Sequence, residues 1–290
     1  MKAALLGDNI GASLTPSLHE AEGAALGLSY SYGRIDTAGK TLSAADLQGV
    51  LKLAEVDGYS GLNITHPHKT VAASAVDQLE GVAEDLGSVN TILFKNGKCL
   101  GYNTDYGGFQ SAFDQRFGVK QNETVLLCGA GGAGSAVALA LADLGFDRLV
   151  LVDPDLNKAV ELKSRLEALR PSIFVSASAG VRDVPFEYLS GAVNCSPLGM
   201  TGRPGLAFDP SLLSRKAWVV DIVYFPQKTA FLKIAEAHGC QTMGGADMAL
   251  WQAVEAFELL TGAKPDPRRM KHTMDWLLQN GSEAEQGRSA

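Results

Sequence analysis

Two kinds of apolar pattern alternate along the chain: short runs typical of buried strands, and longer runs in which apolar residues recur at helical spacing. In the first part of the chain, strands are predicted at residues 2–7, 29–36, 59–64, 89–94 and 98–102. Helices are predicted between and after them, at residues 15–26, 43–55, 68–74, 79–85 and 105–117. This alternation favours an α/β fold.

Local signals support several of these elements. Thr15 precedes Pro16, which is typical of a helix with Thr15 at its N-cap. Ser43 is predicted to cap the next helix. The dipeptide Asn96-Gly97 predicts a tight turn, so the strands on either side of it are expected to form a hairpin.

The alternation continues after residue 124 and predicts a doubly wound parallel sheet. Strands are expected at residues 124–128, 148–152, 173–176, 191–194, 218–221 and 241–243. Helices are expected at residues 132–144, 156–169 and 228–238. Two last helices, residues 247–260 and 268–279, precede a polar tail, residues 281–290, that is expected to be unstructured.

A glycine-rich turn joins the first strand of this sheet to its first helix. It reads Gly129-Ala130-Gly131-Gly132-Ala133-Gly134. Gly129 is expected to make the turn, Gly131 to let a pyrophosphate approach the backbone, and Gly134 to let helix and strand pack closely. The free N–H groups at the helix start would face the phosphates. The strand, the turn and the helix start together predict a dinucleotide fingerprint. No Lys-Ser or Lys-Thr pair follows, so a Walker-type phosphate loop is not expected.

The next strand ends in two acidic residues. Asp153 is at the position where a carboxylate accepts a hydrogen bond from the adenosine ribose 2′-OH and repels a 2′-phosphate, which favours NAD over NADP. Asp155 is either a second ribose ligand or the N-cap of the following helix. Lys158 and Arg165 on that helix weaken the argument against a 2′-phosphate.

Composition limits the classes of function. Hydrophobic residues make up 46% and charged residues 20% of the chain, which is typical of a soluble globular protein. The formal net charge of -7 argues against a nucleic-acid partner. No apolar run approaches the roughly 20 residues of a membrane helix, and the N-terminus does not resemble a signal peptide. The four cysteines are widely spaced and form no metal-binding pattern, so reduced thiols in a cytoplasmic protein are expected.

Polar residues follow the first and third strands of the first domain. Ser13 and Thr15 lie two residues apart, so their hydroxyls could donate to one carboxylate. Asn63, Thr65 and Lys69 come at the end of the third strand, where ligands bind in open α/β sheets. Lys69 is expected in the first turn of a helix. The positive end of the helix dipole disfavours a charged ammonium group there, which suits a lysine that takes part in proton transfer. The alternative is a solvated surface lysine.

A third polar group flanks the predicted hairpin. Asn90 lies at the start of its first strand, and Asp105 follows its second strand. Asp105 either caps the next helix or faces a ligand.

Together these residues resemble the shikimate dehydrogenase family over the whole length of the chain. The matching motifs are Ser13-Leu14-Thr15-Pro16 with His19, Asn63-Ile64-Thr65-His66-Pro67-His68-Lys69, Asn90-Thr91, Asn103-Thr104-Asp105, the glycine turn, Asn194-Cys195-Ser196-Pro197-Leu198-Gly199-Met200, Asp221-Ile222-Val223-Tyr224-Phe225-Pro226, and Gly244-Gly245 with Gln252.

The resemblance implies three parts. Residues 1–105 are expected to form an α/β domain that binds substrate and carries the catalytic residues. Residues 106–246 are expected to form a Rossmann-type domain that binds NAD, and residues 247–290 to form helices that pack back on the first domain. The implied reaction is the reversible oxidation of a ring hydroxyl to a ketone.

The resemblance also implies roles for individual residues. Lys69 would move the hydroxyl proton, with Asp105 hydrogen-bonded nearby. The substrate carboxylate would bind Ser13, Thr15 and Tyr224, and the ring hydroxyls would bind Asn63, Thr65, Asn90, Asp105 and Gln252. The residues implied to contact the cofactor are the glycine turn at 129–134, Asp153, Asp155, Asn194, Ser196, Met200 and Gly245.

Two departures indicate a branch of the family. Biosynthetic members usually carry Ser-x-Ser and Asn-Arg-Thr where this chain has Ser13-Leu14-Thr15 and Asp153-Pro154-Asp155. The pair is similar to that of NAD-preferring quinate/shikimate dehydrogenases, which implies oxidation of quinate to 3-dehydroquinate and of shikimate to 3-dehydroshikimate. A cytoplasmic monomer or homodimer with no metal, membrane or nucleic-acid partner is expected. The alternatives are an NADP-dependent biosynthetic shikimate dehydrogenase, an aminoshikimate-specific relative and an NAD-sensing binding protein.

Overall fold

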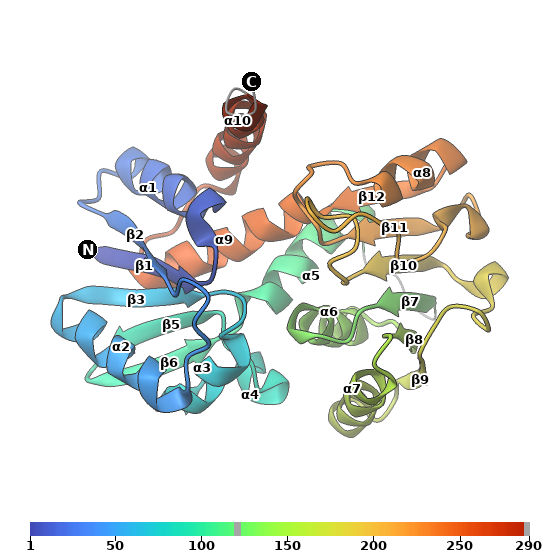
Figure 1. Ribbon diagram of the computed structural model, residues 1–290, viewed down its shortest axis with the longest axis horizontal. Helices are drawn as coiled ribbons and strands as arrows, with labels where there is room; N and C mark the ends of the chain where they lie inside the picture. The colour runs from blue at the N-terminus through green and yellow to red at the C-terminus, as the bar shows by residue number, and fades with distance from the viewer. Residues whose placement is uncertain (119–122, 287–290) are drawn as a thin grey trace. The chain divides into compact units, whose positions relative to one another are not determined.

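The chain divides into two compact units (Figure 1). The computed structural model describes residues 1–118 and 123–286. Unit 1 comprises Met1–Thr104 and Leu250–Ala290, and unit 2 comprises Asp105–Ala249.

Unit 1 is built on a six-stranded sheet with the strand order β2-β1-β3-β5-β6-β4. Its strands are β1 (Lys2–Gly7), β2 (Ser31–Asp36), β3 (Tyr59–Ile64), β4 (Gln78–Leu79), β5 (Thr91–Lys95) and β6 (Lys98–Tyr102). β5 is antiparallel to both of its neighbours, and the other pairs are parallel. The carboxyl ends of β1, β3 and β6 therefore lie at the same edge of the sheet as the start of β5.

Both faces of the unit 1 sheet are covered by helices, so successive residues of β1 are buried on opposite sides. Ala4 and Leu6 belong to a core shared with the helices that follow β2 and β3, whereas Ala3 and Leu5 pack in a separate cluster with Leu260. The helices of this unit are α1 (Thr15–Ala25), α2 (Ala44–Val56), α3 (Lys69–Ala75), α4 (Val82–Leu86), α9 (Gly245–Thr261), which begins in unit 2, and α10 (Pro267–Gln286), with the short 3-10 helix η1 (Ile10–Ala12).

An ion pair holds the C-terminal helices on α1. Glu22 of α1 is only 1% exposed, and it accepts hydrogen bonds from Arg269 Nε at 2.7 Å and from the Asp266 backbone N–H at 2.7 Å. The predicted return of the C-terminal helices to the first domain is confirmed.

Unit 2 carries a fully parallel sheet with the strand order β12-β11-β10-β7-β8-β9. Its strands are β7 (Thr124–Cys128), β8 (Arg148–Val152), β9 (Phe174–Ser178), β10 (Gly191–Asn194), β11 (Trp218–Asp221) and β12 (Gln241–Gly244). The order reverses between β7 and β10, which is the arrangement of a Rossmann-type sheet. The predicted α/β fold with a doubly wound parallel sheet is confirmed.

Aromatic and aliphatic residues bury the two faces of this second sheet. The Phe113 ring lies 4.8 Å from the ring of Trp218 on β11, and the Phe146 ring lies 5.7 Å from the same indole. Phe231 of α8 belongs to another core cluster with Leu126 and Val219. The helices of the unit are α5 (Thr104–Phe117), α6 (Gly132–Asp143), α7 (Leu156–Leu169) and α8 (Ala230–His238), with the short 3-10 helices η2 (Phe186–Tyr188) and η3 (Pro210–Leu212).

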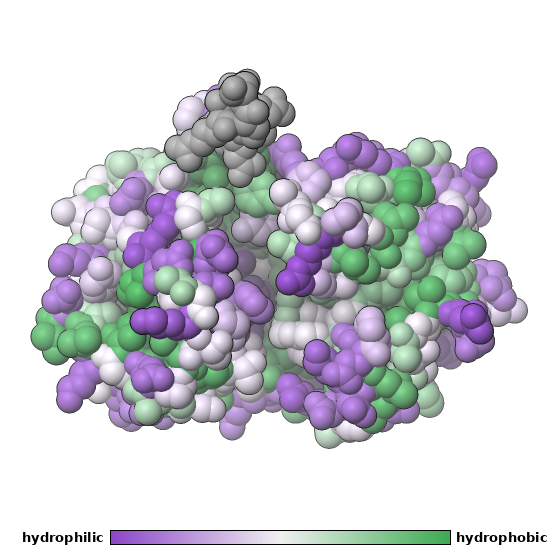
Figure 2. All heavy atoms as spheres, in the orientation of Figure 1, coloured by the Kyte–Doolittle hydropathy of each residue, from purple (hydrophilic) through white to green (hydrophobic). Residues whose placement is uncertain are grey.

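Several large apolar side chains are exposed on the surface of the described residues. Leu53 and Val56, which are 72% and 79% exposed, lie toward the end of α2, where Figure 2 shows a small hydrophobic area. In the described ranges, none of the helices combines the length and the apolar character needed to cross a bilayer.

Three local predictions differ from the structure. α1 begins at Thr15 itself, so its N-cap is Leu14, which makes no side-chain cap hydrogen bond, and the Thr15 N–H donates to Ser13 Oγ. Leu79, expected to start a helix, belongs to the strand β4 instead, because the Glu80 N–H donates to Gly101 O of β6, and α4 starts only after Gly81. α10 continues to Gln286, so the helix extends into the tail that was expected to be unstructured, even though Gly281 is a poor helix former. The rest of the expected tail, residues 287–290, lies outside the described residues.

Candidate active site

The predicted substrate residues of unit 1 follow one edge of its sheet. Ser13 and Thr15 come after β1, Asn63 and Thr65 lie at the end of β3, and Asn90 immediately precedes β5. Because β5 runs antiparallel to its neighbours, its first residue meets the carboxyl end of β3, and Thr91 pairs with Asn63. The topology thus brings together polar side chains that are far apart in the sequence.

Asn63 is 4% exposed and lies at the centre of a hydrogen-bond network. Its Nδ2 donates to Thr91 Oγ1 at 2.8 Å and to the Asn90 carbonyl oxygen at 3.3 Å. Its Oδ1 accepts the Tyr32 hydroxyl at 2.6 Å.

Asn90 is fully buried and joins the same network. Its Oδ1 accepts the backbone N–H of Thr104 at 2.7 Å and the hydroxyl of Thr91 at 3.2 Å. Asn90 therefore ties the start of β5 to the start of α5.

Lys69 is partly buried and is the first residue of α3, so it lies in the first turn of a helix as predicted, although the helix starts one residue later than expected. The Val89 N–H donates to its carbonyl oxygen at 2.9 Å, so the backbone of Lys69 is fixed against the segment that leads to Asn90. The preceding residue, His68, is buried with Nε2 3.2 Å from Thr37 Oγ1. Burial lowers the pKa of His68.

The two hydroxyls after β1 lie next to each other. Ser13 Oγ donates to Thr15 Oγ1 at 3.2 Å, and Arg34 Nη2 donates to the Ser13 carbonyl oxygen at 2.9 Å. Thr65 lies against Gly7, where a Cβ would be 2.2 Å from Thr65 Cγ2. Glycine at position 7 is therefore required for Thr65 to occupy its place.

Three further substrate candidates lie on or next to other elements. Asp105 is 3% exposed and lies in the first turn of α5 and not at its N-cap, because the helix begins at Thr104. Gln252 lies on α9 and is partly buried. Tyr224 belongs to unit 2, where it follows β11 and its ring lies 4.7 Å from that of Phe225. Burial raises the pKa of Tyr224.

The glycine turn follows β7, at the point where the strand order reverses. Gly129 has a φ of +103°, and a Cβ there would be 2.7 Å from the backbone of Cys195. At Gly134 a Cβ would be 1.9 Å from the Gly129 carbonyl oxygen. These two positions accept only glycine, because the turn, the helix and the segment directly after β10 approach one another too closely for a side chain.

The start of α6, unlike Gly129 and Gly134, leaves space for side-chain atoms. Apart from its chain neighbours and the adjoining helix backbone, a Cβ added at Gly131 or Gly132 would meet no described atom within 4 Å, and no described side chain caps the helix at Gly131. Ser135 makes the first bond of the helix, to the Gly131 carbonyl oxygen. The N–H groups of Gly132 and Ala133 therefore lie at an uncapped helix start, which is a ready anion-binding site.

Asp153 connects the end of β8 to the glycine turn. One carboxylate oxygen accepts the Ala130 N–H at 2.8 Å, and the other accepts the Asp155 N–H at 2.9 Å. Asp155 caps α7, because its carboxylate accepts the Asn157 N–H at 3.2 Å. The capping alternative for Asp155 is thus realised, and a ribose contact from the same side chain remains a prediction.

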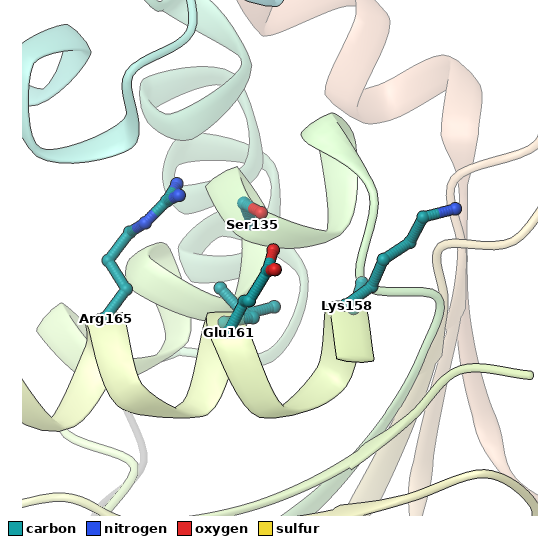
Figure 3. A pocket seen from close by; sticks show the side chains of 6 residues that line it. Ser135, Lys158, Glu161 and Arg165 are labelled. Carbon is teal, nitrogen blue, oxygen red and sulfur yellow. The ribbon is translucent and has the colours of Figure 1, made fainter. Parts of the chain in front are cut away.

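A pocket of about 60 Å³ lies between α6 and α7 beside this turn. Ala130, Ser135, Lys158, Glu161, Leu162 and Arg165 line it. Figure 3 shows Glu161 on α7 between Lys158 and Arg165, with Ser135 facing it. An acid between the two cations disfavours binding of a 2′-phosphate here, so the two cations do not cancel the argument from Asp153.

Asn194 shapes the loop that follows β10. Its Oδ1 accepts the N–H and the hydroxyl of Ser196, and its Nδ2 donates to Leu198 O and to Asp221 Oδ1. All four hydrogen-bonding positions of this fully buried amide are used inside the protein. We therefore expect Asn194 to support the loop that carries Ser196 and Met200, and not to bind a cofactor through its side chain.

The last two cofactor candidates differ in exposure. Met200 is 40% exposed on the loop after β10. Gly245 is buried at the start of α9, where a Cβ would be 2.2 Å from Ile222 O, so only glycine fits. Among the described residues, no group of three His, Cys, Asp or Glu side chains could hold a metal ion.

Some residues that hold the candidate site residues in place were not predicted from the sequence. Tyr32, Thr91 and Thr104 fix the two asparagine amides, and Gly7 makes room for Thr65. Thr91 and Thr104 stand beside Asn90 and Asp105 in the matching motifs, which was an available signal. No pattern in the sequence pointed to Tyr32.

Comparison with known proteins agrees with this arrangement. Residues 5–92 match the family described as the shikimate dehydrogenase substrate binding domain, and residues 245–274 match the shikimate 5'-dehydrogenase C-terminal domain.

Similar proteins cover almost the whole chain. A quinate/shikimate dehydrogenase (NAD(+)) of Corynebacterium glutamicum (strain R) is 41% identical over 93% of this chain and 96% of that protein. A shikimate dehydrogenase (NADP(+)) of Pseudarthrobacter chlorophenolicus is 40% identical over 92% of each chain. The solved structure of quinate dehydrogenase from Corynebacterium glutamicum in complex with NAD superimposes with a TM-score of 0.87 at 40% identity, and covers 94% of this chain and 98% of that one.

Proposed function

The chain belongs to the shikimate dehydrogenase family, and on this premise we propose that it oxidises quinate to 3-dehydroquinate and shikimate to 3-dehydroshikimate with NAD. Relatives that use NAD and relatives that use NADP are almost equally similar to the chain, so overall identity does not decide the cofactor. The proposal of NAD rests on the position of Asp153. Its carboxylate accepts a hydrogen bond from the Ala130 N–H of the glycine turn at 2.8 Å. A 2′-phosphate beside that charge would be repelled.

The residues of unit 2 fit a dinucleotide. The uncapped N–H groups at the start of α6 would hold the pyrophosphate, and the absence of side chains at Gly131 and Gly132 leaves space for it. Asp153 would accept the ribose hydroxyls with the lone pairs that its two backbone bonds leave unused. Bound NAD supplies the nicotinamide ring that accepts a hydride from the substrate.

The residues of unit 1 would bind the substrate and move its proton. Thr15 would donate its hydroxyl to the substrate carboxylate, and Ser13 would turn its hydroxyl from Thr15 Oγ1 to the same carboxylate. Asn63 and Asn90 would orient the ring. Lys69 Nζ would take the proton of the reacting hydroxyl as the carbon loses its hydride, so that a ketone forms. Proton transfer by a positioned side chain typically contributes about 10²–10⁴-fold to the rate.

Asp105 would hold this proton-transfer group in place. Asp105 is buried and comes directly after Thr104, whose backbone N–H donates a hydrogen bond to Asn90 Oδ1. Tyr224 and Gln252 are proposed as further contacts of the substrate, and Thr65, Ser196, Met200 and Gly245 complete the proposed substrate and cofactor surroundings.

We expect the enzyme to act in the cytoplasm as a monomer or homodimer. The four cysteines, Cys99, Cys128, Cys195 and Cys240, are free thiols, which fits a reducing compartment. Burial raises the pKa of Cys128 to about 12, so this thiol is expected to be unreactive.

Initial rates with quinate and with shikimate, each with NAD and with NADP, test the proposal. We expect turnover of both substrates and at least about tenfold higher kcat/KM with NAD, because an unfavourable contact of about 1.4 kcal/mol changes the ratio by that factor. A preference for NADP would contradict the role of Asp153. Activity with shikimate alone would favour the biosynthetic alternative, and NAD binding without turnover of any substrate would favour a cofactor sensor.

A further inference from the structure

The orientation of the Asn63 amide is determined by its neighbours. Nδ2 lies 3.3 Å from the Asn90 carbonyl oxygen, an atom that can only accept a hydrogen bond. This contact identifies the nitrogen end of the amide. The oxygen end must then face Tyr32, whose hydroxyl donates to Asn63 Oδ1 at 2.6 Å. Burial raises the pKa of Tyr32, so this hydroxyl keeps its proton.

Thr91 fixes the amide from the other side. Asn63 Nδ2 donates to Thr91 Oγ1 at 2.8 Å, and that hydroxyl donates in turn to Asn90 Oδ1 at 3.2 Å. The orientation of Asn90 is independently set, because its Oδ1 also accepts the Thr104 backbone N–H. Donors and acceptors therefore agree along the whole series from Tyr32 to Asn90.

A count of hydrogen bonds shows what Asn63 can still offer. A primary amide has two donors and two acceptor positions. In the described part of the chain, both donors and one acceptor position of Asn63 are taken. The amide can therefore offer a ligand one Oδ1 lone pair, and a group that binds there must be a donor such as a hydroxyl.

We propose that Tyr32 and Thr91 are positioning residues, which hold Asn63 so that its free Oδ1 lone pair receives a hydroxyl of the substrate ring. This inference rests on the proposed function, in which Asn63 binds such a hydroxyl. Tyr32 reaches Asn63 from β2 across β1, because the strand order is β2-β1-β3. The ring of Tyr32 is itself packed 4.5 Å from the ring of His19.

A double-mutant cycle with Tyr32→Phe and Asn63→Ala tests the proposal. Loss of one hydrogen bond to a neutral partner predicts that Tyr32→Phe raises the KM for quinate and shikimate about three- to tenfold. The KM for NAD should stay constant and kcat should change less than about twofold. In the Asn63→Ala background, Tyr32→Phe should have no further effect on the substrate KM.

The matched control is Tyr30→Phe. The Tyr30 hydroxyl lies 3.2 Å from His19 Nδ1 and makes no contact with Asn63 in the described structure, so its loss removes a comparable hydrogen bond. We expect the substrate KM of this variant to match that of the unmodified protein. An equal rise in KM for Tyr30→Phe and Tyr32→Phe would overturn the proposal, as would multiplicative effects of Tyr32→Phe and Asn63→Ala.

Thr91 provides a second test that holds even if Tyr32→Phe does not fold. Thr91→Val removes the hydroxyl at constant shape and should raise the substrate KM, and Thr91→Ser keeps the hydroxyl and should restore it. Equal KM values for these two variants would overturn the proposal. Failure of the proposed function is distinguishable, because the unmodified protein would then turn over neither quinate nor shikimate.

Discussion

Gly131→Ala separates cofactor binding from folding. Gly131 is exposed, and its backbone, with φ -76° and ψ -169°, is extended and open to any residue. An added Cβ meets nothing within 4 Å. The substitution therefore places one methyl group in the space assigned to the pyrophosphate and disturbs no contact of the described chain.

The expected effect on stability is small because two contributions oppose each other. Alanine reduces the freedom of the unfolded chain and stabilises the fold by about 0.4–1 kcal/mol, whereas alanine is a poorer N-cap than glycine by a similar amount. We expect a net change within about 0.5 kcal/mol, which shifts Tm by no more than about 2 °C in a protein of this size.

The expected effect on NAD is much larger. A methyl group that holds phosphate oxygens away from the N–H groups of α6 removes at least one hydrogen bond to a charged group, which contributes about 1.5–3 kcal/mol. The Kd for NAD, measured by calorimetric titration, should therefore rise about tenfold or more. Gly49→Ala on α2, which is also exposed and also meets nothing within 4 Å, is the control and should leave the Kd unchanged.

An unchanged Kd for NAD in folded Gly131→Ala would refute the placement of the pyrophosphate. Gly134→Ala should behave in the opposite way. Its Cβ would be 1.9 Å from Gly129 O, so we expect loss of thermal stability before any effect on the cofactor can be measured.

Three further predictions follow from individual side chains. Lys69→Ala should lower kcat by about 10²–10⁴-fold and leave the Kd for NAD near its original value, and near-normal turnover would remove Lys69 from the mechanism. Asp153→Ala should lower kcat/KM with NAD more than with NADP, and equal losses would contradict its role in cofactor choice. Burial lowers the pKa of His19 from 6.5 to about 3. Between these two pH values the unfolded chain binds a proton that the folded protein does not, so the free energy of unfolding falls as the pH drops below 6.5. Urea titrations should show that His19→Phe reduces this slope, by up to about 1.4 kcal/mol per pH unit, and an unchanged slope would contradict a neutral buried imidazole.

The features of the candidate site that can be predicted are those formed by residues close together in the sequence. The glycine turn, Asp153 and the lysine at the start of α3 each depend on residues next to one another in the chain, so a strand, a turn and a helix start are enough to place them. Asp155 could be described only as one of two alternatives, because capping and ribose binding require the same carboxylate at the same helix start.

The features that could not be predicted depend on strand order. Tyr32 meets Asn63 only because β1 lies between β2 and β3, and Thr91 meets Asn63 only because β5 is inserted antiparallel beside β3. Neither arrangement has a signature in the spacing of apolar residues. The internal use of all four hydrogen-bonding positions of Asn194 was equally hidden, since Asp221 lies on the neighbouring strand.

Transfer of the hydride itself can be followed with quinate that carries deuterium at C3. The protein is incubated with this substrate and NAD, and the reduced cofactor and the ketone are analysed by mass spectrometry. We predict that each NADH formed carries one deuterium atom and that 3-dehydroquinate has lost it. Unlabelled NADH, or deuterium released to water, would contradict direct oxidation of the ring carbinol by NAD.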